Sequence, residues 1–536
     1  MRRRSSYAAQ QNGLLYHRTF SHREPRTYIR VRMLLWPPFL RIMALKQDED
    51  FLRFLTMGAA GTAAILDVLN IRHGHRMVEL ERYSTANKIW LTKLKRLRLP
   101  DLLCLDCGIR VEVRAKSTLA IRMSHSASPG REWDAGLRDR DVAAFIAWRH
   151  EPEAPSEHHQ FFQIGGMRSA IQYAKLGARK APSEGAERDI TWPARVPKRN
   201  GRVVEIDSAR GTVRYRPAEG RLCSYSLRGA APAYIYVKAK QTLVGGEQFV
   251  LGCVPTMDNM RCPGQTWDLI HDLNSDDTTD RYAAVKAAAA GHTNQALEHR
   301  LLEIAEDAEE DERIRLEARG SLASIDPERH IDELICYAHR PGSSKSEKAF
   351  AMESIFILSE LRSSEAVNAL AALARDTAAD SEARCAAVWG LGIAGADDAR
   401  QVLPFIADPD DEVALHAMAS VGELDIEALG TLRRMLESGD DRRAASAAAL
   451  LVDEGEDGIS HLLEVAQHRD QSGLWSRAAL GEIPEADLRE TADKKLSPGL
   501  ESALSAIWIS QRSWLKQQAV ENPLDFLRRQ CIRHLG

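Results

Sequence analysis

The stretch 99–116, LPDLLCLDCGIRVEVRAK, combines acidic and basic side chains with apolar ones, and the two kinds alternate over 109–116. Its two short apolar runs, 102–105 and 109–113, flank a turn rich in Cys, Asp and Gly. This pattern is typical of two antiparallel strands joined by a tight hairpin. The hairpin would bring residues that can bind a metal ion and phosphate close together.

Four charged side chains share one face of this hairpin if its turn is centred on Asp106–Cys107 or on Cys107–Gly108, because side chains alternate along a strand. They are Asp101, Glu112, Arg114 and Lys116. In the first register Asp101 lies directly opposite Glu112, with Cβ atoms about 5 Å apart, and in the second the two are diagonal neighbours. A three-residue loop would instead put the two carboxylates on opposite faces.

Two carboxylates this close need a cation between them, and Mg²⁺ binds one or two carboxylates together with phosphate oxygens and water. Asp101 and Glu112 are therefore candidate magnesium ligands and catalytic residues, with Arg114 and Lys116 beside them. Such a site suits hydrolysis of a phosphodiester. The alternative is a surface hairpin whose charges are simply solvated.

At these residues the chain resembles the PD-(D/E)XK nuclease superfamily, whose core carries Pro-Asp on one strand and Glu-X-Lys on the next. Pro100, Asp101 and Glu112 match this pattern, whereas Arg114 occupies the position of the family's lysine. Arginine stays protonated and forks to phosphate, so Arg114 suits binding and Lys116 could take the place of the lysine. The resemblance implies a nuclease-like α/β core, active or decayed.

The surrounding pattern agrees with the order of elements in that core. Residues 50–70 have apolar side chains at helical spacing, 76–83 alternate as a strand does, and 142–148 read as a buried strand. Just before Asp101 the chain is basic, and a phosphate-contacting patch or a solvated strand face would explain this equally well. The candidate nucleic-acid-binding residues are Lys88, Lys93, Lys95, Arg96 and Arg98.

Cys104 and Cys107 form a C-x-x-C-G turn, which often binds zinc through its thiolates. One such turn supplies two ligands, and the candidate partners are Cys253 and Cys262, or Cys223, at spacings that fit no regular four-cysteine motif. Ordinary reduced thiols are the alternative.

The rest of the N-terminal half divides by composition. Residues 1–42 are Arg-rich and predict a disordered basic extension, for which a misassigned upstream start codon is one explanation and a basic arm reaching nucleic acid is the functional alternative. A nuclease-like domain is expected over 43–150. Residues 151–200 are polar and predict a linker with one helix. Residues 201–265 contain short β-type runs separated by Gly and Pro, which predict a small β-rich barrel or sandwich.

After about residue 280 the chain is Ala-rich, with paired amphipathic helices that recur every thirty-odd residues. Such pairs must stack to bury their apolar faces, which predicts an α-solenoid. The resemblance is to short HEAT-like repeats of the PBS-lyase type over about 280–470, followed by a helical cap over 471–536. The acidic balance of 300–460 favours a protein partner over a continuous DNA track.

The sequence as a whole predicts a multidomain α+β protein. Its 536 residues exceed one domain, and its net charge of −4 gives no overall signature of a nucleic-acid-binding protein. The eight scattered cysteines indicate a reducing, cytoplasmic setting. No stretch is apolar enough to span a membrane, so none is expected to do so. Two functions follow: a metal-dependent nuclease-like protein whose solenoid recruits a partner, or a non-enzymatic scaffold for protein–protein interaction.

Overall fold

The computed structural model covers the whole chain, and the part described below consists of 45–80, 90–92, 94, 97–180, 187–291, 294–340, 342, 344–394, 399–422, 424–492 and 496–517, without the side chains of 45–56, 492 and 509–517. The predicted extension over 1–42 and four of the predicted nucleic-acid-binding residues, Lys88, Lys93, Lys95 and Arg96, lie outside it. The chain forms two compact units, which meet in sequence between Thr431 and Leu432.

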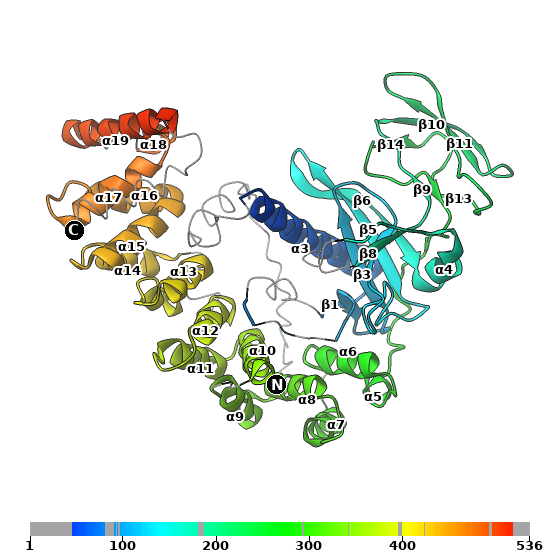
Figure 1. Cartoon of the computed structure of the whole chain (residues 1–536), viewed down its shortest axis with the longest axis horizontal. Helices are drawn as coiled ribbons and strands as arrows, with labels where there is room; N and C mark the ends of the chain where they lie inside the picture. Colours follow the sequence, from blue (N-terminus) through cyan, green and yellow to red (C-terminus); the bar gives the residue numbers. More distant parts are fainter. Residues whose placement is uncertain are drawn as a thin grey trace, which may run out of the picture. The chain divides into compact units, whose positions relative to one another are not determined.

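A five-stranded mixed sheet forms the centre of the N-terminal half (Figure 1). Its strands, in spatial order, are β1 (Met77–Glu79), β2 (Leu102–Cys104), β3 (Arg110–Lys116), β5 (Val142–His150) and β6 (Glu153–Gln163). Strands β3 and β5 are parallel, and the other neighbouring pairs are antiparallel. The predicted helix and the strands predicted around 76–83 and 142–148 are all present.

Helix α3 (Leu45–His73) runs alongside one face of this sheet (Figure 1). Ile65 and Leu69 are fully buried against the side chains of β2, β3 and β5 that point to this face. A Cβ added at Gly61 would lie 2.6 Å from the Cβ of Ala115, so the small residues of the helix allow it to approach β3 closely. One face of β3 is therefore apolar and closed, and its charged side chains point to the other face.

The opposite face of the sheet packs against a second apolar cluster. Phe145 and Phe162 contribute to it from β5 and β6, and Trp133 and Trp192 stack edge-to-face within it at 4.9 Å between ring centroids. A three-stranded sheet lies in this region, formed by β4 (Arg122–His125), β8 (Arg188–Thr191) and β7 (Lys175–Leu176). The connection from β3 to β5 therefore contains one strand, β4, which belongs to this second sheet.

The described parts of the stretch 151–200, which are 151–180 and 187–200, contain regular secondary structure throughout much of their length, in contrast to the predicted linker with one helix. It contains β6, α4 (Ile164–Ser169), the 3-10 turn Ile171–Tyr173, β7, β8 and β9 (Ala194–Arg195). Strand β6 was not predicted because its composition is polar. It is an edge strand of the sheet, and many of its side chains are exposed or half-buried, in contrast to Phe161 and Phe162.

The β-rich region exists, but its described strands form no closed barrel. They make a four-stranded sheet, ordered β12 (Cys223–Tyr225), β11 (Thr212–Pro217), β10 (Gly201–Asp207) and β14 (Thr242–Leu243), and a three-stranded sheet, ordered β13 (Tyr234–Ile235), β15 (Leu251–Gly252) and β9. The two sheets share none of these described strands, and each keeps two open edges. Val203, Val213 and Leu251 share one small core between the sheets.

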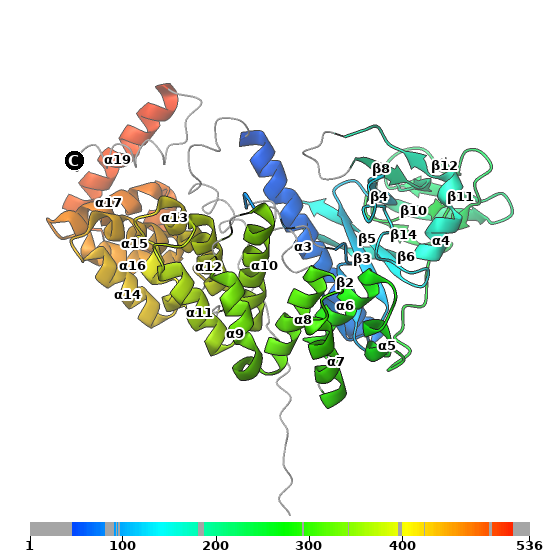
Figure 2. The same ribbon diagram turned by 60° about the horizontal axis from the view of Figure 1, so that its bottom comes forward.

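The C-terminal half consists of consecutive helices compatible with a helical repeat (Figure 2). They are α5 (Leu269–Leu273), α6 (Thr278–Ala288), α7 (Gln295–Glu306), α8 (Glu312–Ile325), α9 (Pro327–Ala338), α10 (Lys345–Leu361), α11 (Ser364–Arg375), α12 (Ser381–Ala394), two 3-10 turns (Ala399–Gln401 and Leu403–Phe405), α13 (Asp411–Ser420), α14 (Ile426–Leu436), α15 (Asp441–Asp453), α16 (Gly455–Val465), α17 (Gln471–Glu482), α18 (Glu485–Ala492) and α19 (Pro498–Gln517). Acids at the turns cap helices, as Asp277, Asp410 and Asp440 do with side-chain oxygens. Part of the acidic balance therefore stabilises helix ends.

The sheet and the first helices of the helical stack share one core. Leu99 and Leu103 from the hairpin region are buried in the same cluster as Tyr282 from α6 and Leu301 from α7. An ion pair crosses the same boundary, because the guanidinium of Arg110 lies 2.7 Å from the Asp280 carboxylate. The sheet is thus fixed to the helices that follow it in sequence.

Replacement of Arg110 by Met should destabilise the fold by about 2–3 kcal/mol, because it removes a buried cation that pairs with Asp280 and leaves the neutralisation of this carboxylate to Arg138. The Arg110 side chain is only 1% exposed, and it also donates to the carbonyl of Gly136 at 3.1 Å. Urea denaturation measures the change in the free energy of unfolding. The control is Arg214→Met on β11, whose pair with Glu205 is half exposed and should contribute less than about 1 kcal/mol. Equal effects would contradict the structural role of Arg110.

Among the described residues, no helix is long and apolar enough to cross a membrane.

Candidate metal centre and charged sheet face

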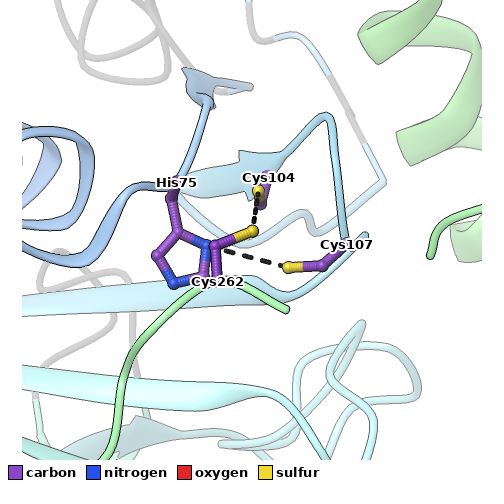
Figure 3. Close-up of side chains that lie close together, drawn as sticks. All are labelled: His75, Cys104, Cys107 and Cys262. Atoms are coloured by element: carbon purple, nitrogen blue, oxygen red, sulfur yellow. Dashed lines mark hydrogen bonds between the residues drawn. The ribbon is translucent and has the colours of Figure 1, made fainter. Parts of the chain in front are cut away.

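Four potential metal ligands converge beside the hairpin: His75, Cys104, Cys107 and Cys262 (Figure 3). We call them the metal cluster. They come from the loop after α3, from β2, from the hairpin turn and from the segment that precedes α5. Their donor atoms all lie within 4.8 Å of one another. Three of the four residues are buried.

The spacing of the donor atoms suits a tetrahedral ion. Sulfur atoms 2.3 Å from a tetrahedral zinc ion lie about 3.8 Å apart, and a sulfur and a nitrogen lie slightly closer. The Cys104 and Cys262 sulfurs are 3.9 Å apart, and the Cys107 sulfur lies 3.7 Å from Nδ1 of His75. An ion could enter the cluster with little movement of these side chains.

The second nitrogen of His75 has a partner of its own. Its Nε2 lies 2.6 Å from the carbonyl oxygen of Met260, an atom that can only accept a hydrogen bond. The Nε2 atom therefore carries the proton and donates, which leaves the Nδ1 lone pair directed at the cysteines when the ring is neutral. Ligand histidines are commonly oriented by such a contact.

The local backbone explains why the cysteines converge. The amide of Gly108 donates to the Cys104 carbonyl, and Gly108 has a positive φ of 67°, which favours glycine at the end of the turn. A Cβ at Gly108 would meet the Trp267 ring at 2.4 Å. Cys262 is placed from the other side, because its amide donates to the His73 carbonyl.

Hydrogen bonding couples the ionisation of the cluster. The Cys107 thiol holds the pKa of Cys104 at about 3, against the effect of burial, and the same contact raises the pKa of Cys107. Burial alone would lower the pKa of His75, but hydrogen bonds to Cys104 and to the Met260 carbonyl raise it. The cluster therefore already favours a thiolate, the form of cysteine that binds metals.

The sequence analysis named three of these four potential ligands, Cys104 and Cys107 as a pair and Cys262 as one of their candidate partners. Cys262 joins Cys104 and Cys107, whereas Cys253 is buried in the apolar cluster around Phe249 and Cys223 lies on β12. His75 was missed. Its signal was a histidine in the short loop between a predicted helix and the strand that pairs with the hairpin.

The hairpin adopts the register centred on Asp106–Cys107. Leu102 pairs with Val111 and Leu103 with Arg110, and continuation of this register puts Asp101 opposite Glu112. Arg114 and Lys116 follow Glu112 at two-residue intervals on β3, so they point to the same side of the strand. We call Arg98, Asp101, Glu112, Arg114 and Lys116 the charged sheet face.

The two carboxylates of this face already have protein partners. Asp101 accepts a hydrogen bond from the Val113 amide at 2.6 Å. Glu112, whose side chain is 6% exposed, is ion-paired with Arg114 on the same strand and with Arg98, at 3.6 Å. Arg98 also donates to the Glu132 carbonyl. Arg98 is the one predicted nucleic-acid-binding residue that the structure describes, and through its ion pair with Glu112 it is part of the charged sheet face.

Lys116 has an unusual ionisation. Burial and the nearby cations Arg114, Arg122 and Lys180 lower its pKa to about 8, against the opposing effect of Asp189. Neutral lysine is thus accessible near physiological pH. Its Cα nevertheless lies about 13 Å along the strand from that of Glu112, twice the spacing of a Glu-X-Lys motif.

A group of three or more His, Cys, Asp or Glu side chains able to hold one ion occurs at one place in the part of the chain described here, the metal cluster. The magnesium prediction for Asp101 and Glu112 has no comparable support.

No family model matches the sequence, and no curated protein is significantly similar to it.

Proposed function

We propose that the sheet domain binds a nucleic acid and hydrolyses its phosphodiester bonds with the help of a divalent cation. The observation that supports this most is the hairpin register, whose continuation puts Asp101 opposite Glu112. Three basic side chains lie on the same charged sheet face. Acids for a hard cation and bases for phosphate are the two requirements of such a site.

In this proposal each side chain has a distinct role. Asp101 and Glu112 would hold Mg²⁺, which stabilises charge on the phosphate, and Glu112 would exchange its arginine partners for the ion. Arg98 and Arg114 would then be released to fork to phosphate oxygens. Lys116 would accept a proton from the attacking water, which its lowered pKa allows.

The metal cluster has a different role, that of a structural zinc site. Three thiolates and one imidazole fill a tetrahedral shell and leave no position for substrate, which is the mark of a structural site. The ion would join three parts of the chain that are far apart in sequence: His75, the hairpin with its two cysteines, and Cys262. It would thereby hold the hairpin, and with it the charged sheet face, against the segment leading to the helices.

The helical stack is proposed to be a HEAT-like solenoid that recruits a protein partner. The support is its composition of successive amphipathic helix pairs, of which α15 and α16 are an example. The excess of acids over bases in 300–460 is the reason to favour a protein over a nucleic acid on this surface.

The test is a cleavage assay on labelled single- and double-stranded DNA and RNA, with Mg²⁺ or Mn²⁺ and with EDTA. Cleavage should require the cation and should fall by about 100-fold or more in Asp101→Asn, because the amide is a poor ligand. The Asn carbonyl can still accept from the Val113 amide, so the fold should be kept. Cleavage that persists undiminished in Asp101→Asn does not depend on Asp101, and this result would refute the proposed catalytic site.

One observation favours the alternative function, a non-enzymatic scaffold. Glu112 is enclosed between two arginines, an arrangement that also neutralises a buried acid in a purely structural core. If no substrate is cleaved under any of these conditions, the charged sheet face is structural and the helical stack carries the function as a protein-binding surface.

A further inference from the structure

A tryptophan from the segment before β2 is buried among helices that lie about 300 residues later in the sequence. The Trp90 side chain is 3% exposed. Its ring stacks on that of His416 from α13, with centroids 4.8 Å apart and planes inclined by 16°. Trp389 from α12 and Phe356 from α10 lie at 6.0 and 5.8 Å. Three helices thus form an aromatic socket around one side chain.

Polar contacts fix the same segment next to the socket. The backbone amide of Thr92 donates to one carboxylate oxygen of Glu382 at 2.9 Å, and its hydroxyl donates to the other at 2.7 Å. Glu382 lies in the first turn of α12. Leu94 is buried, whereas Leu91 is 86% exposed. Trp90 and Thr92 therefore both contact the helices, while the side chain of Leu91 between them points to solvent.

The socket holds the ring as an uncharged surface. Burial lowers the pKa of His416 to about 4, so its imidazole is neutral at pH 7 and stacks face to face on the indole. Glu382 is the charged group that opposes this shift. The buried indole and the paired carboxylate together give the segment one apolar and one polar anchor.

We propose that helices α10, α12 and α13 form a binding site for a Trp-containing segment, and that the chain occupies it with its own Trp90 and Thr92. The occupant leads after a few residues to Leu99, which is buried in the core shared with α6, and to Asp101. The docked segment therefore ties the approach to the charged sheet face to the inner helices. This inference does not depend on the proposed nuclease activity.

Hydrogen exchange of the full-length protein, read by mass spectrometry, tests the docking. Trp90→Ala should raise the exchange rate of peptides covering 90–99 by about tenfold or more, because undocking opens the amide contact of Thr92. Glu382→Gln should raise it by less, since it weakens one anchor only. Leu91→Ala is the matched control from the same segment and should leave the rate unchanged.

A binding experiment then tests the site itself. A fluorescently labelled synthetic peptide with the sequence of residues 87–98 should bind Trp90→Ala protein, whose socket is vacated, and should bind wild type at least about tenfold more weakly because its own segment competes. The same peptide with Ala in place of Trp should not bind. Unchanged exchange in both Trp90→Ala and Glu382→Gln, or equal binding of both peptides, would overturn the proposal.

Discussion

Replacement of Cys262 by Ser is expected to remove zinc from the protein and to lower its melting temperature by on the order of 10 °C. The reason is that the ligands are far apart in sequence: the whole β-rich region lies in the chain between Cys107 and Cys262. A structural zinc ion contributes its binding free energy to folding, and several kcal/mol shift the melting temperature of a unit of this size by many degrees. Elemental analysis of wild type should give about one zinc per chain.

The control for this prediction is Cys336→Ser, because Cys336 is an exposed free cysteine on α9. It should change neither the zinc content nor the melting temperature. A strong chelator should lower the melting temperature of wild type and leave that of Cys262→Ser unchanged. Wild type purified without chelator that holds under about a tenth of an equivalent of zinc would refute a zinc site, and the cluster would then consist of reduced thiols.

The difference between what the sequence predicted and what it missed in this cluster follows from sequence distance. The C-x-x-C-G turn is a local motif, because its geometry depends on a few consecutive residues and on the positive φ of Gly108. His75 and Cys262 reach it only because α3 packs on the sheet and because the chain returns to the amide–carbonyl contact between Cys262 and His73. Both contacts join residues that are far apart in the sequence, so no local motif predicts them.

The charged sheet face shows the same limit. The strand period and the turn predicted which residues of β3 share a side, and the register is the one centred on Asp106–Cys107. What the sequence could not predict is that Arg98 lies beside Glu112, or that the cations around Lys116 include Arg122 and Lys180 from other segments. The partners of a charge depend on tertiary packing, and they determine whether it is available for chemistry.

The identity of the proton acceptor gives the second large effect. If Lys116 is the base, Lys116→Met should reduce cleavage by about 10²–10⁴-fold. The rate of wild type should rise with pH and level off above about 8, because a lysine whose pKa is lowered becomes neutral, and able to accept a proton, as the pH passes that value. Arg122→Met is the control: Arg122 helps to lower the pKa of Lys116, so its removal should move the inflection to higher pH without abolishing cleavage.

Arg114→Lys distinguishes the two candidate positions for that base. Arg114 lies two residues after Glu112 on β3, at the lysine position of the Glu-X-Lys pattern that the sequence resembles, and it is ion-paired with Glu112. If Lys116 acts as base, the new lysine should weaken substrate binding through loss of the guanidinium fork while the inflection near pH 8 persists. If cleavage instead increases and no longer requires Lys116, Arg114 stands at a decayed catalytic position and the assignment of Lys116 is wrong. A double variant, Arg114→Lys with Lys116→Met, separates these outcomes, because it is inactive in the first case and active in the second.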